Sequence, residues 1–396
     1  MTFSTLRRAS VDSLPREPGV RLARFSVPVL LGGVLIQLVL KLSAAPLFVD
    51  FLAMWTGGHL AASHPLAIYD PAIVDRAQAW LLGPAAHDRP FPYPPDSLLI
   101  FQPLGVLPFW SAALVWMALT VAAFCVVVAS LQPRARGLVL TLTLLAPGAV
   151  WAILSGQCVF LTGALAIAGV AHLERRPVLA GVLLGAAAAF KPTVLLMAPA
   201  ALIGGRHWRS LIVSGLSGLA FVALSALIWG PGLWFAWLAY APRYLAAITA
   251  NPAYVTAIVA PAGLAAQLGL SGPPLLIWRL AFAGAGCVAA VLVFRRSKAL
   301  WPRLTALFGA SLIATPYAMN YETTLLLPGA VLALLSVWGA RARGLAFGAY
   351  WALAFAGLPV VGPLAVFVYF ALALACGRAD ETERPQGAVE VEPAVA

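Results

Sequence analysis

Charged residues are scarce in this sequence. Aspartate, glutamate, lysine and arginine together make up only 10% of its 396 residues, whereas a soluble domain carries about 25%. Hydrophobic residues make up 62% and the mean hydropathy is +0.92. Many apolar stretches reach or approach the roughly 20 residues that a helix needs to cross a bilayer. This scarcity of charge excludes a water-soluble domain and predicts an all-α integral membrane protein with several membrane crossings.

Cysteine and the signatures of soluble enzymes are also sparse. The four cysteines lie singly in apolar segments without CxxC spacing, so neither a disulfide framework nor a zinc site is indicated. The sequence has no Walker loop, no HExxH or GxSxG motif, and no GxGxxG followed by an acidic partner. We therefore expect no metal, no cofactor and no ATP-driven work.

Basic residues outnumber acidic ones and give a net charge of +11, but their distribution argues against a nucleic-acid partner. They gather in short clusters between apolar runs, among them Arg175 and Arg176, Arg206 and Arg209, and Arg341 and Arg343. The positive-inside rule places these clusters in the cytoplasm. The pattern predicts a plasma-membrane protein in contact with lipid, with both termini cytoplasmic and about 12 transmembrane helices.

The predicted organisation has three parts: a basic cytoplasmic N-terminus (1–25), a membrane domain (26–377) and a disordered acidic cytoplasmic tail (378–396). A large, helical extracytoplasmic loop (47–96) follows the first membrane helix. We expect an amphipathic helix at 71–82, a short dipping helix at 97–107, and membrane helices at 109–131 and 138–154. The segment 178–204 has Lys191-Pro192 at its middle. Two halves of about 13 residues are too short to cross, so we predict a hairpin with Lys191 at the bottom of a recess.

Three aspartates of the loop lie where helices are expected to begin. Asp50 is flanked by Phe48, Val49, Phe51 and Leu52, and an acid in such apolar surroundings is a functional candidate, here a catalytic base. The alternative for Asp50 is a helix N-cap, and the residues alone leave both open. Asp70 precedes Pro71, which indicates an N-cap. Asp96 follows the stiff FPYPP run that holds Tyr93, and is also interpreted as a cap.

Two cations, Lys191 and Arg279, lie within apolar runs, and each needs an anion at membrane depth. The anion could be Glu322 or Asp50, or the phosphate of a lipid-linked ligand. We favour phosphate for Lys191 and a carboxylate for Arg279, while retaining both as candidate phosphate-binding residues. The polar turns around Ser155-Gly156-Gln157 and Thr315–Glu322 are expected to meet at the same recess. The candidate substrate cavity comprises Trp55, Tyr93, Gln157, Asn320, Tyr321 and Glu322.

Several motifs in order resemble a known family. They are VDF and MW-x-GG-H after the first apolar run, F-x-YPP-x-x-LLIFQPLGVLP, SGQ-x-x-FLTGAL, FKPTVLLMAPAAL, and TPYAMNYETTLLLP. Together, over about residues 26–340, they resemble glycosyltransferase family 87, membrane enzymes of the GT-C superfamily that are similar to mannosyltransferases using polyprenyl-phosphate mannose.

The resemblance implies an inverting transfer of a sugar, mannose first, from a polyprenyl-phosphate donor to a hydroxyl of a lipid or glycan acceptor on the extracytoplasmic side. It implies Asp50 as the general base, Lys191 as a partner of the donor phosphate, and Gln157 as a cavity-lining residue. Around TPYAMNYE the family often has a histidine or aspartate, where this chain has Met319, Asn320 and Glu322. This departure leaves the donor sugar open.

Two other classes of protein compete with an enzyme. A transporter or flippase could use Asp50, Lys191 and Arg279 as a translocation path, but such proteins are built from repeats, and no internal repeat is recognisable. A non-catalytic membrane subunit would have Asp50 as a simple cap.

Overall fold

The computed structural model describes residues 15–44, 47–83, 89–355 and 361–382, and within these the secondary structure is helical. The first part of the chain forms α1 (Glu17–Ala44), α2 (Val49–Ala61), η2 (Pro65–Tyr69), α3 (Pro71–Leu82), η3 (Pro95–Ser97), α4 (Leu98–Gly105) and α5 (Phe109–Leu131). The middle part forms η4 (Pro133–Ala135), α6 (Arg136–Leu144), α7 (Pro147–Ser155), α8 (Val159–His172), α9 (Pro177–Phe190), η5 (Pro192–Leu195), α10 (Ala198–Gly204) and α11 (Trp208–Trp229). The last part forms α12 (Gly232–Ala250), α13 (Pro252–Val255), α14 (Pro261–Gln267), α15 (Gly272–Arg296), α16 (Leu300–Ala314), η6 (Asn320–Leu325), α17 (Leu327–Ser336), α18 (Ala340–Ala354) and α19 (Val361–Thr382).

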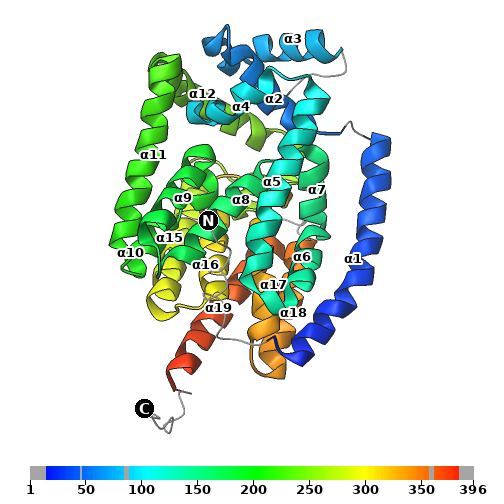
Figure 1. The fold of residues 1–396 in the computed structure, drawn as a ribbon, viewed down its shortest axis with the longest axis vertical. Coiled ribbons are helices and arrows are strands. Elements are labelled where there is room, and N and C mark those ends of the chain that lie inside the picture. Colours follow the sequence, from blue (N-terminus) through cyan, green and yellow to red (C-terminus); the bar gives the residue numbers. More distant parts are fainter. Residues whose placement is uncertain (1–14, 45–46, 84–88, 356–360, 383–396) are drawn as a thin grey trace, which may run out of the picture.

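The helices that follow the first apolar run gather at one end of the molecule. Figure 1 shows α2, α3 and α4 at the top together with α12, whereas α10, α18 and the end of α19 lie toward the bottom. We call the end that carries α2, α3 and α4 the loop end. The helices at 71–82 and 109–131 have the bounds that the sequence predicts, and the dipping helix is observed as Leu98–Gly105.

Four helices in the described part of the chain, α1, α5, α11 and α15, are long and apolar enough to cross a membrane. A fifth crossing is counted if the bent pair Pro133–Leu144 and Pro147–Ser155 forms one span. Several shorter apolar helices, such as α8 and α16, complete the bundle. The protein is therefore an all-helical membrane protein, and the larger count of about 12 crossings stays a prediction.

The single membrane helix predicted at 138–154 is wrong in one respect. The chain bends there by 68° between α6 and α7. Pro147 has no backbone N–H to donate, and the residue before a proline disfavours the helical conformation. Ala146 accordingly has extended backbone angles, φ −63° and ψ 136°.

The break predicted at Lys191-Pro192 is confirmed. α9 ends at Phe190, and Lys191 has φ −148° and ψ 85°, which lies outside the helical region. The short η5 and α10 then complete the second half of the hairpin. Because the backbone is not helical at Lys191, its side chain leaves the hairpin at the junction of two short helices.

The two ends of the chain differ from the expected bounds. α1 begins at Glu17, earlier than the predicted residue 26, and α19 continues to Thr382, five residues into the expected tail. The remainder of that tail, 383–396, lies outside the described residues, as do residues 1–14.

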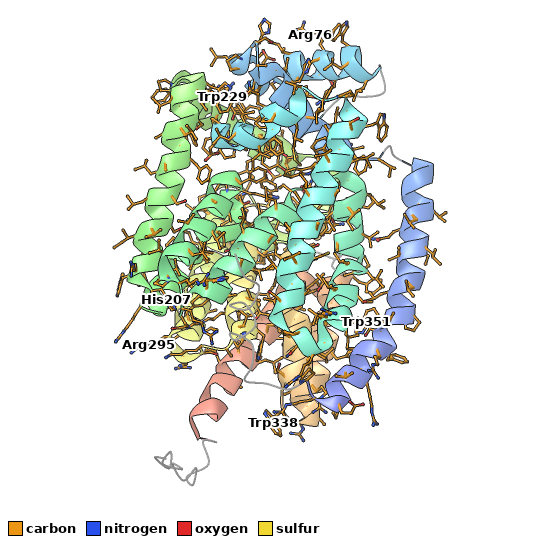
Figure 2. All side chains as sticks on the ribbon, viewed as in Figure 1. Arg76, His207, Trp229, Arg295, Trp338 and Trp351 are labelled. Atoms are coloured by element: carbon orange, nitrogen blue, oxygen red, sulfur yellow. The ribbon has the colours of Figure 1, made fainter. Side chains whose placement is uncertain are left out.

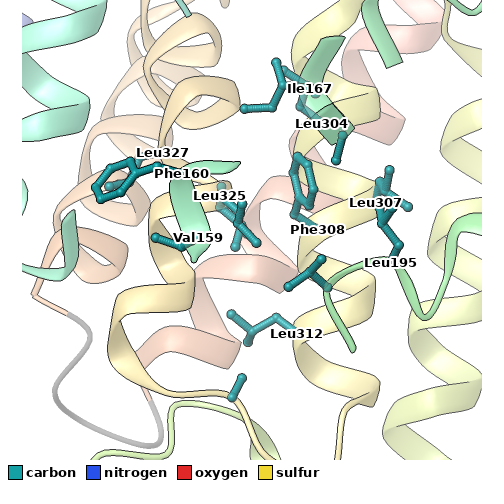
Figure 3. Packing of buried hydrophobic residues seen from close by; sticks show 14 of the residues in the cluster. Val159, Phe160, Ile167, Leu195, Leu304, Leu307, Phe308, Leu312, Leu325 and Leu327 are labelled. Carbon is teal, nitrogen blue, oxygen red and sulfur yellow. The ribbon is translucent and has the colours of Figure 1, made fainter. Parts of the chain in front are cut away.

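The hydrophobic core is centred on α8, α16 and α17. Almost every side chain of α16 is buried, including Leu304, Leu307 and Phe308. Figure 3 shows these residues facing Ile167 of α8 and Leu195 of η5. Burial on all sides distinguishes α16 from α11, which is mostly exposed on the surface of the bundle. The core therefore fixes the hairpin of Lys191 against α16, while α11 stands at the periphery.

Candidate active site

Asp50 is the second residue of α2, but it is not the N-cap. The N-cap position is Phe48, whose φ of 59° is left-handed and which makes no side-chain capping hydrogen bond. The Phe48 N–H donates to the Leu154 carbonyl over 2.8 Å, which ties the start of α2 to the end of α7. The N-cap interpretation of Asp50 is therefore wrong. The side chain of Asp50 is half-buried.

A tight turn supports the first turn of α2. Gly156 has φ 77°, and a Cβ there would lie 2.6 Å from the Cβ of Phe51, so only glycine fits. Its carbonyl accepts a hydrogen bond from Trp116 Nε1 at 3.1 Å. The next residue, Gln157, is 3% exposed, and its Oε1 has no hydrogen-bond partner among the described residues. The backbone of this turn therefore lies against the first turn of α2, which carries Asp50.

Two tyrosines from other parts of the chain interact electrostatically with Asp50. Its carboxylate interacts with the hydroxyl groups of Tyr321, in η6, and Tyr244, in α12. The ring of Tyr244 lies 6.2 Å from that of Tyr317, centroid to centroid, so the two phenol groups are neighbours. Three elements distant in sequence therefore meet at Asp50, and two of them contribute phenol groups.

Lys191 forms an ion pair with Glu322. The two residues are 8% and 6% exposed, so both charges are withdrawn from water. The Lys191 Nζ also lies 5.5 Å from the centroid of the Tyr321 ring, within the range of a cation–π contact. Of the anions considered for Lys191, Glu322 is the one that the structure pairs with it. Binding of a donor phosphate by Lys191 stays a prediction.

We call Asp50, Lys191, Tyr244, Tyr317, Tyr321 and Glu322 the acid–lysine cluster. Tyr93 adjoins it, because its hydroxyl lies 3.4 Å from the Sγ of Cys158 and both side chains are buried. The ring of Tyr93 packs on Phe190, the last residue of α9 before Lys191. Tyr93 is therefore an interior residue and not an aromatic anchor at the membrane surface.

Backbone pairing holds η6 in place. The Val259 N–H donates to the Ala318 carbonyl over 2.7 Å, and the Asn320 N–H donates to the Ala257 carbonyl over 3.1 Å. The carbonyl of Asn320 accepts from the Thr323 hydroxyl at 2.7 Å. The segment between α13 and α14 therefore pairs with the segment preceding Tyr321. Asn320 contributes through its backbone.

Two candidate residues are not brought into the acid–lysine cluster. Trp55 is buried and donates from Nε1 to the Leu107 carbonyl at 2.9 Å, which fastens α2 to the chain after α4. Arg279 is half-buried on α15, forms no ion pair with another described residue, and has no hydrogen-bond partner at Nε. The contacts of Trp55 are those of a packing residue.

The other two aspartates differ from each other. Asp70 caps α3 as predicted, because its Oδ1 accepts from the N–H groups of Ala72 at 2.9 Å and Ile73 at 3.3 Å. Asp96 is not the N-cap of α4, since that position is Ser97. Asp96 is 5% exposed and its Oδ1 has no hydrogen-bond partner among the described residues. The cap interpretation of Asp96 is wrong.

Sequence reasoning missed Tyr244. It belongs to the run YAPRYL within a segment that otherwise indicated only an outer loop. A tyrosine beside an arginine gives no sign of its partner when that partner is 73 positions away, as Tyr317 is.

Within the described residues, no group of three or more His, Cys, Asp or Glu side chains is arranged to hold a metal.

The helical fold and its apolar spans define an integral membrane protein with a buried polar site near its loop end. Residues 91–316, more than half of the chain, match the model of glycosyltransferase family 87, and the chain belongs to this family. It is therefore a membrane glycosyltransferase. The matched region includes Lys191, whereas Asp50 and Glu322 lie outside it. Comparisons with curated proteins and with solved structures found no match.

Proposed function

We propose that the protein transfers a sugar, mannose in the first instance, from a polyprenyl-phosphate donor to a hydroxyl of a lipid or glycan acceptor. The single observation that supports this reaction is the shared neighbourhood of a carboxylate and an ammonium around Tyr321. The Asp50 carboxylate interacts electrostatically with the Tyr321 hydroxyl, and the Lys191 Nζ lies 5.5 Å from the centroid of the Tyr321 ring. A base and a phosphate-binding cation are the two groups that such a transfer needs.

Asp50 is the general base in this proposal. Its carboxylate takes the proton of the acceptor hydroxyl as the hydroxyl oxygen forms a bond to the anomeric carbon of the sugar. The bond between that carbon and the phosphate oxygen breaks, and polyprenyl phosphate leaves with the electron pair. A single displacement inverts the anomeric configuration. One carboxylate suffices, unlike glycoside hydrolysis, which uses two.

Lys191 stabilises the departing phosphate. In the structure its partner is Glu322, so the donor phosphate would approach an ammonium that already has a carboxylate neighbour. Glu322 holds Lys191 in position, and Tyr321 and Tyr244 supply hydroxyl groups that can orient the sugar. A buried ion pair is retained where its charges serve a further role, because apolar replacements are often equally stable.

The positions of basic residues indicate how the protein is oriented in the membrane. Arg295 and His207 lie near the bottom of Figure 2, opposite Arg76 at the loop end. If basic clusters mark the cytoplasm, then the loop end, Asp50 and the reaction face outward, both termini lie inside, and the protein is a GT-C-type enzyme of the plasma membrane.

The test is transfer of radiolabelled sugar by the purified protein in lipid nanodiscs. Polyprenyl-phosphate mannose, glucose and arabinose are offered separately with a mixed lipid extract as acceptor. The proposal predicts a labelled lipid or glycan product with one of these donors, mannose giving the most. Absence of transfer from all three, together with movement of the intact donor across a vesicle membrane, would establish the flippase alternative instead.

A further inference from the structure

A cavity of about 460 Å³ lies between the α9–α10 hairpin and α11, next to the acid–lysine cluster but separate from it. Its walls are mainly apolar, with Leu195, Leu196, Leu202 and Leu211 along one part and Trp234 and Trp237 at another. In Figure 1, α11 runs along the left edge of the bundle from α10 to α12. The cavity therefore extends from the loop end along a peripheral helix.

The cavity has an amphiphilic lining. Asp96, Trp234 and Trp237 belong to its loop end, whereas α11 lines it from Leu211 to Val222, a helix rise of about 16 Å. Two glycines of α11, Gly215 and Gly218, belong to this wall, and a Cβ at Gly215 would meet no atom within 4 Å. A long apolar space below a polar group matches the shape of a lipid.

Asp96 is the polar group that this lipid would meet. It is 95% buried, lines the cavity, and has an Oδ1 without a hydrogen-bond partner among the described residues. Leaving a buried acceptor without a hydrogen bond is unfavourable. The indole N–H groups nearby are already engaged, because Trp237 donates to the Pro92 carbonyl and Trp234 to the Ser225 hydroxyl. Neither indole group therefore satisfies Asp96, and its carboxyl is the polar group of the lining toward which a headgroup hydroxyl can be directed.

The charge of the lining decides which lipid fits. Among the described residues that line the cavity there is no lysine, arginine or histidine, and Asp96 is the sole ionisable side chain. At pH 8, above the pKa of about 7 that burial gives Asp96, a phosphate headgroup would meet no cation and would be repelled by the Asp96 carboxylate. Hydroxyl groups would donate to that carboxylate, and Trp234 and Trp237 add apolar aromatic surface to the lining, against which a sugar ring can pack.

We propose that this cavity binds a membrane lipid whose headgroup is uncharged and rich in hydroxyl groups, such as a glycosylated lipid. The acyl or isoprenoid chain lies along α11, and a headgroup hydroxyl donates to Asp96. The site excludes lipid phosphates, so it is distinct from the phosphate position at Lys191. Lys191 of the neighbouring cluster precedes Pro192 of the cavity wall, and Tyr93, which adjoins the cluster, lies three residues before Asp96. A lipid held here is thus a candidate acceptor, and that role alone rests on the proposed function.

The test is photolabelling of the full chain in phosphatidylcholine nanodiscs at pH 8, where Asp96 is ionised. The probe is a dodecyl glucoside that carries a diazirine in the middle of its chain, and labelled peptides are mapped by mass spectrometry. Three competitors are compared: dodecyl glucoside, dodecyl phosphate, and dodecyl glucoside with all hydroxyl groups methylated. We expect labelling between Leu211 and Val222 that dodecyl glucoside suppresses at about tenfold lower concentration than either other competitor.

Two variants and one control locate the effect. Gly215→Leu places a side chain in the part of the cavity where the lipid chain would lie, and should abolish the labelling that dodecyl glucoside suppresses. Gly284→Leu on α15, where a Cβ also meets no atom within 4 Å, is the control and should leave that labelling unchanged. Asp96→Asn removes the charge and should bring the glucoside and the phosphate to within about threefold of each other.

Equal competition by dodecyl phosphate in the wild type, or labelling of α11 that no competitor reduces, would overturn the inference. Because labelling requires no catalysis, either outcome leaves the proposed transfer intact. A failed transfer assay likewise leaves the lipid site standing.

Discussion

Asp50, Asp70 and Asp96 belong to the same region of sequence, and each lies within two residues of a helix start, yet they differ in what surrounds them. Asp70 is exposed, and its carboxylate is engaged by the backbone of α3. Asp96 is buried beside a cavity. Asp50 is half-buried, and its carboxylate interacts electrostatically with Tyr244 and Tyr321, which belong to helices distant in sequence. The comparison teaches that an aspartate near a helix start is a cap only when its own side chain reaches the first N–H groups.

The largest difference should be seen between Asp50→Asn and Asp70→Asn. Loss of a general base lowers the rate of transfer by about 10²–10⁴-fold, and asparagine at position 50 cannot take a proton. Asparagine caps helices as well as aspartate does, so Asp70→Asn should retain wild-type transfer and serves as the matched control. The measurement is the initial rate of sugar transfer at saturating donor. Equal rates for the two variants would remove Asp50 from catalysis.

A second prediction concerns the pair of Lys191 and Glu322. Lys191→Met leaves a buried carboxylate without its partner and should lower the free energy of unfolding by about 3–5 kcal/mol. The double variant Lys191→Met/Glu322→Gln removes both charges and should recover most of that loss. Both variants should bind the polyprenyl-phosphate donor at least about tenfold more weakly, because one charge-assisted contact to the phosphate is lost.

The measurements for this pair are chemical denaturation in detergent and donor binding by the same samples, with Arg279→Met as the control cation. Recovery of stability together with lost binding supports a phosphate role for Lys191. Recovery of both stability and donor binding in the double variant would show that the pair is only structural.

Asp96 should make stability depend on pH. Burial raises its pKa from 3.8 to about 7, although the neighbouring backbone N–H groups of Asp96 and Ser97 oppose the shift. The folded protein therefore holds a proton that the unfolded chain releases, so stability falls as pH rises from about 4 to 7 and is level above that. Tyr69, the titratable group that interacts with Asp96, stays neutral in this range, because burial and the Asp96 charge raise its pKa.

The measurement for Asp96 is the apparent Tm between pH 5 and pH 8. The wild type should lose stability relative to Asp96→Asn as the pH increases, since asparagine has no proton to release. Parallel pH curves for the two proteins would mean that Asp96 does not titrate in this interval.

Asp70→Ala should give the smallest effect. Removing the two capping hydrogen bonds costs about 1 kcal/mol at an N-cap, and α3 carries no residue of the acid–lysine cluster. We expect a small drop in the unfolding midpoint, full recovery in Asp70→Asn, and unchanged transfer. A transfer defect in Asp70→Ala with an intact midpoint would show that α3 contributes to the reaction.

The sequence predicts local features of this fold well. Pro71 after Asp70 indicates the start of α3, and Lys191-Pro192 indicates the break between α9 and η5, because proline acts through its immediate neighbours. The bend at Pro147 carries the same signal but was hidden within a long apolar run. Such a run is compatible with one helix or two, and periodicity alone does not separate them.

The site was predictable only in part, because its pairings are long-range. Lys191 is recognisable as a buried cation, but the choice of Glu322 over Asp50 or phosphate depends on how η6 packs against the hairpin. Tyr244 reaches Asp50 only because α12 folds over the loop end. Asp96 resembles Asp70 in sequence, and only the cavity beside α11 distinguishes the two.

The most direct test of the account is an experimental structure with a donor that cannot be transferred. This donor is a polyprenyl phosphonate in which a carbon atom replaces the oxygen between the sugar and phosphorus. The account predicts the phosphonate oxygens beside Lys191 Nζ and the anomeric carbon facing the Asp50 carboxylate next to Tyr321. A phosphonate bound in the cavity beside Asp96 and α11, with Asp50 remote from the sugar, would contradict it.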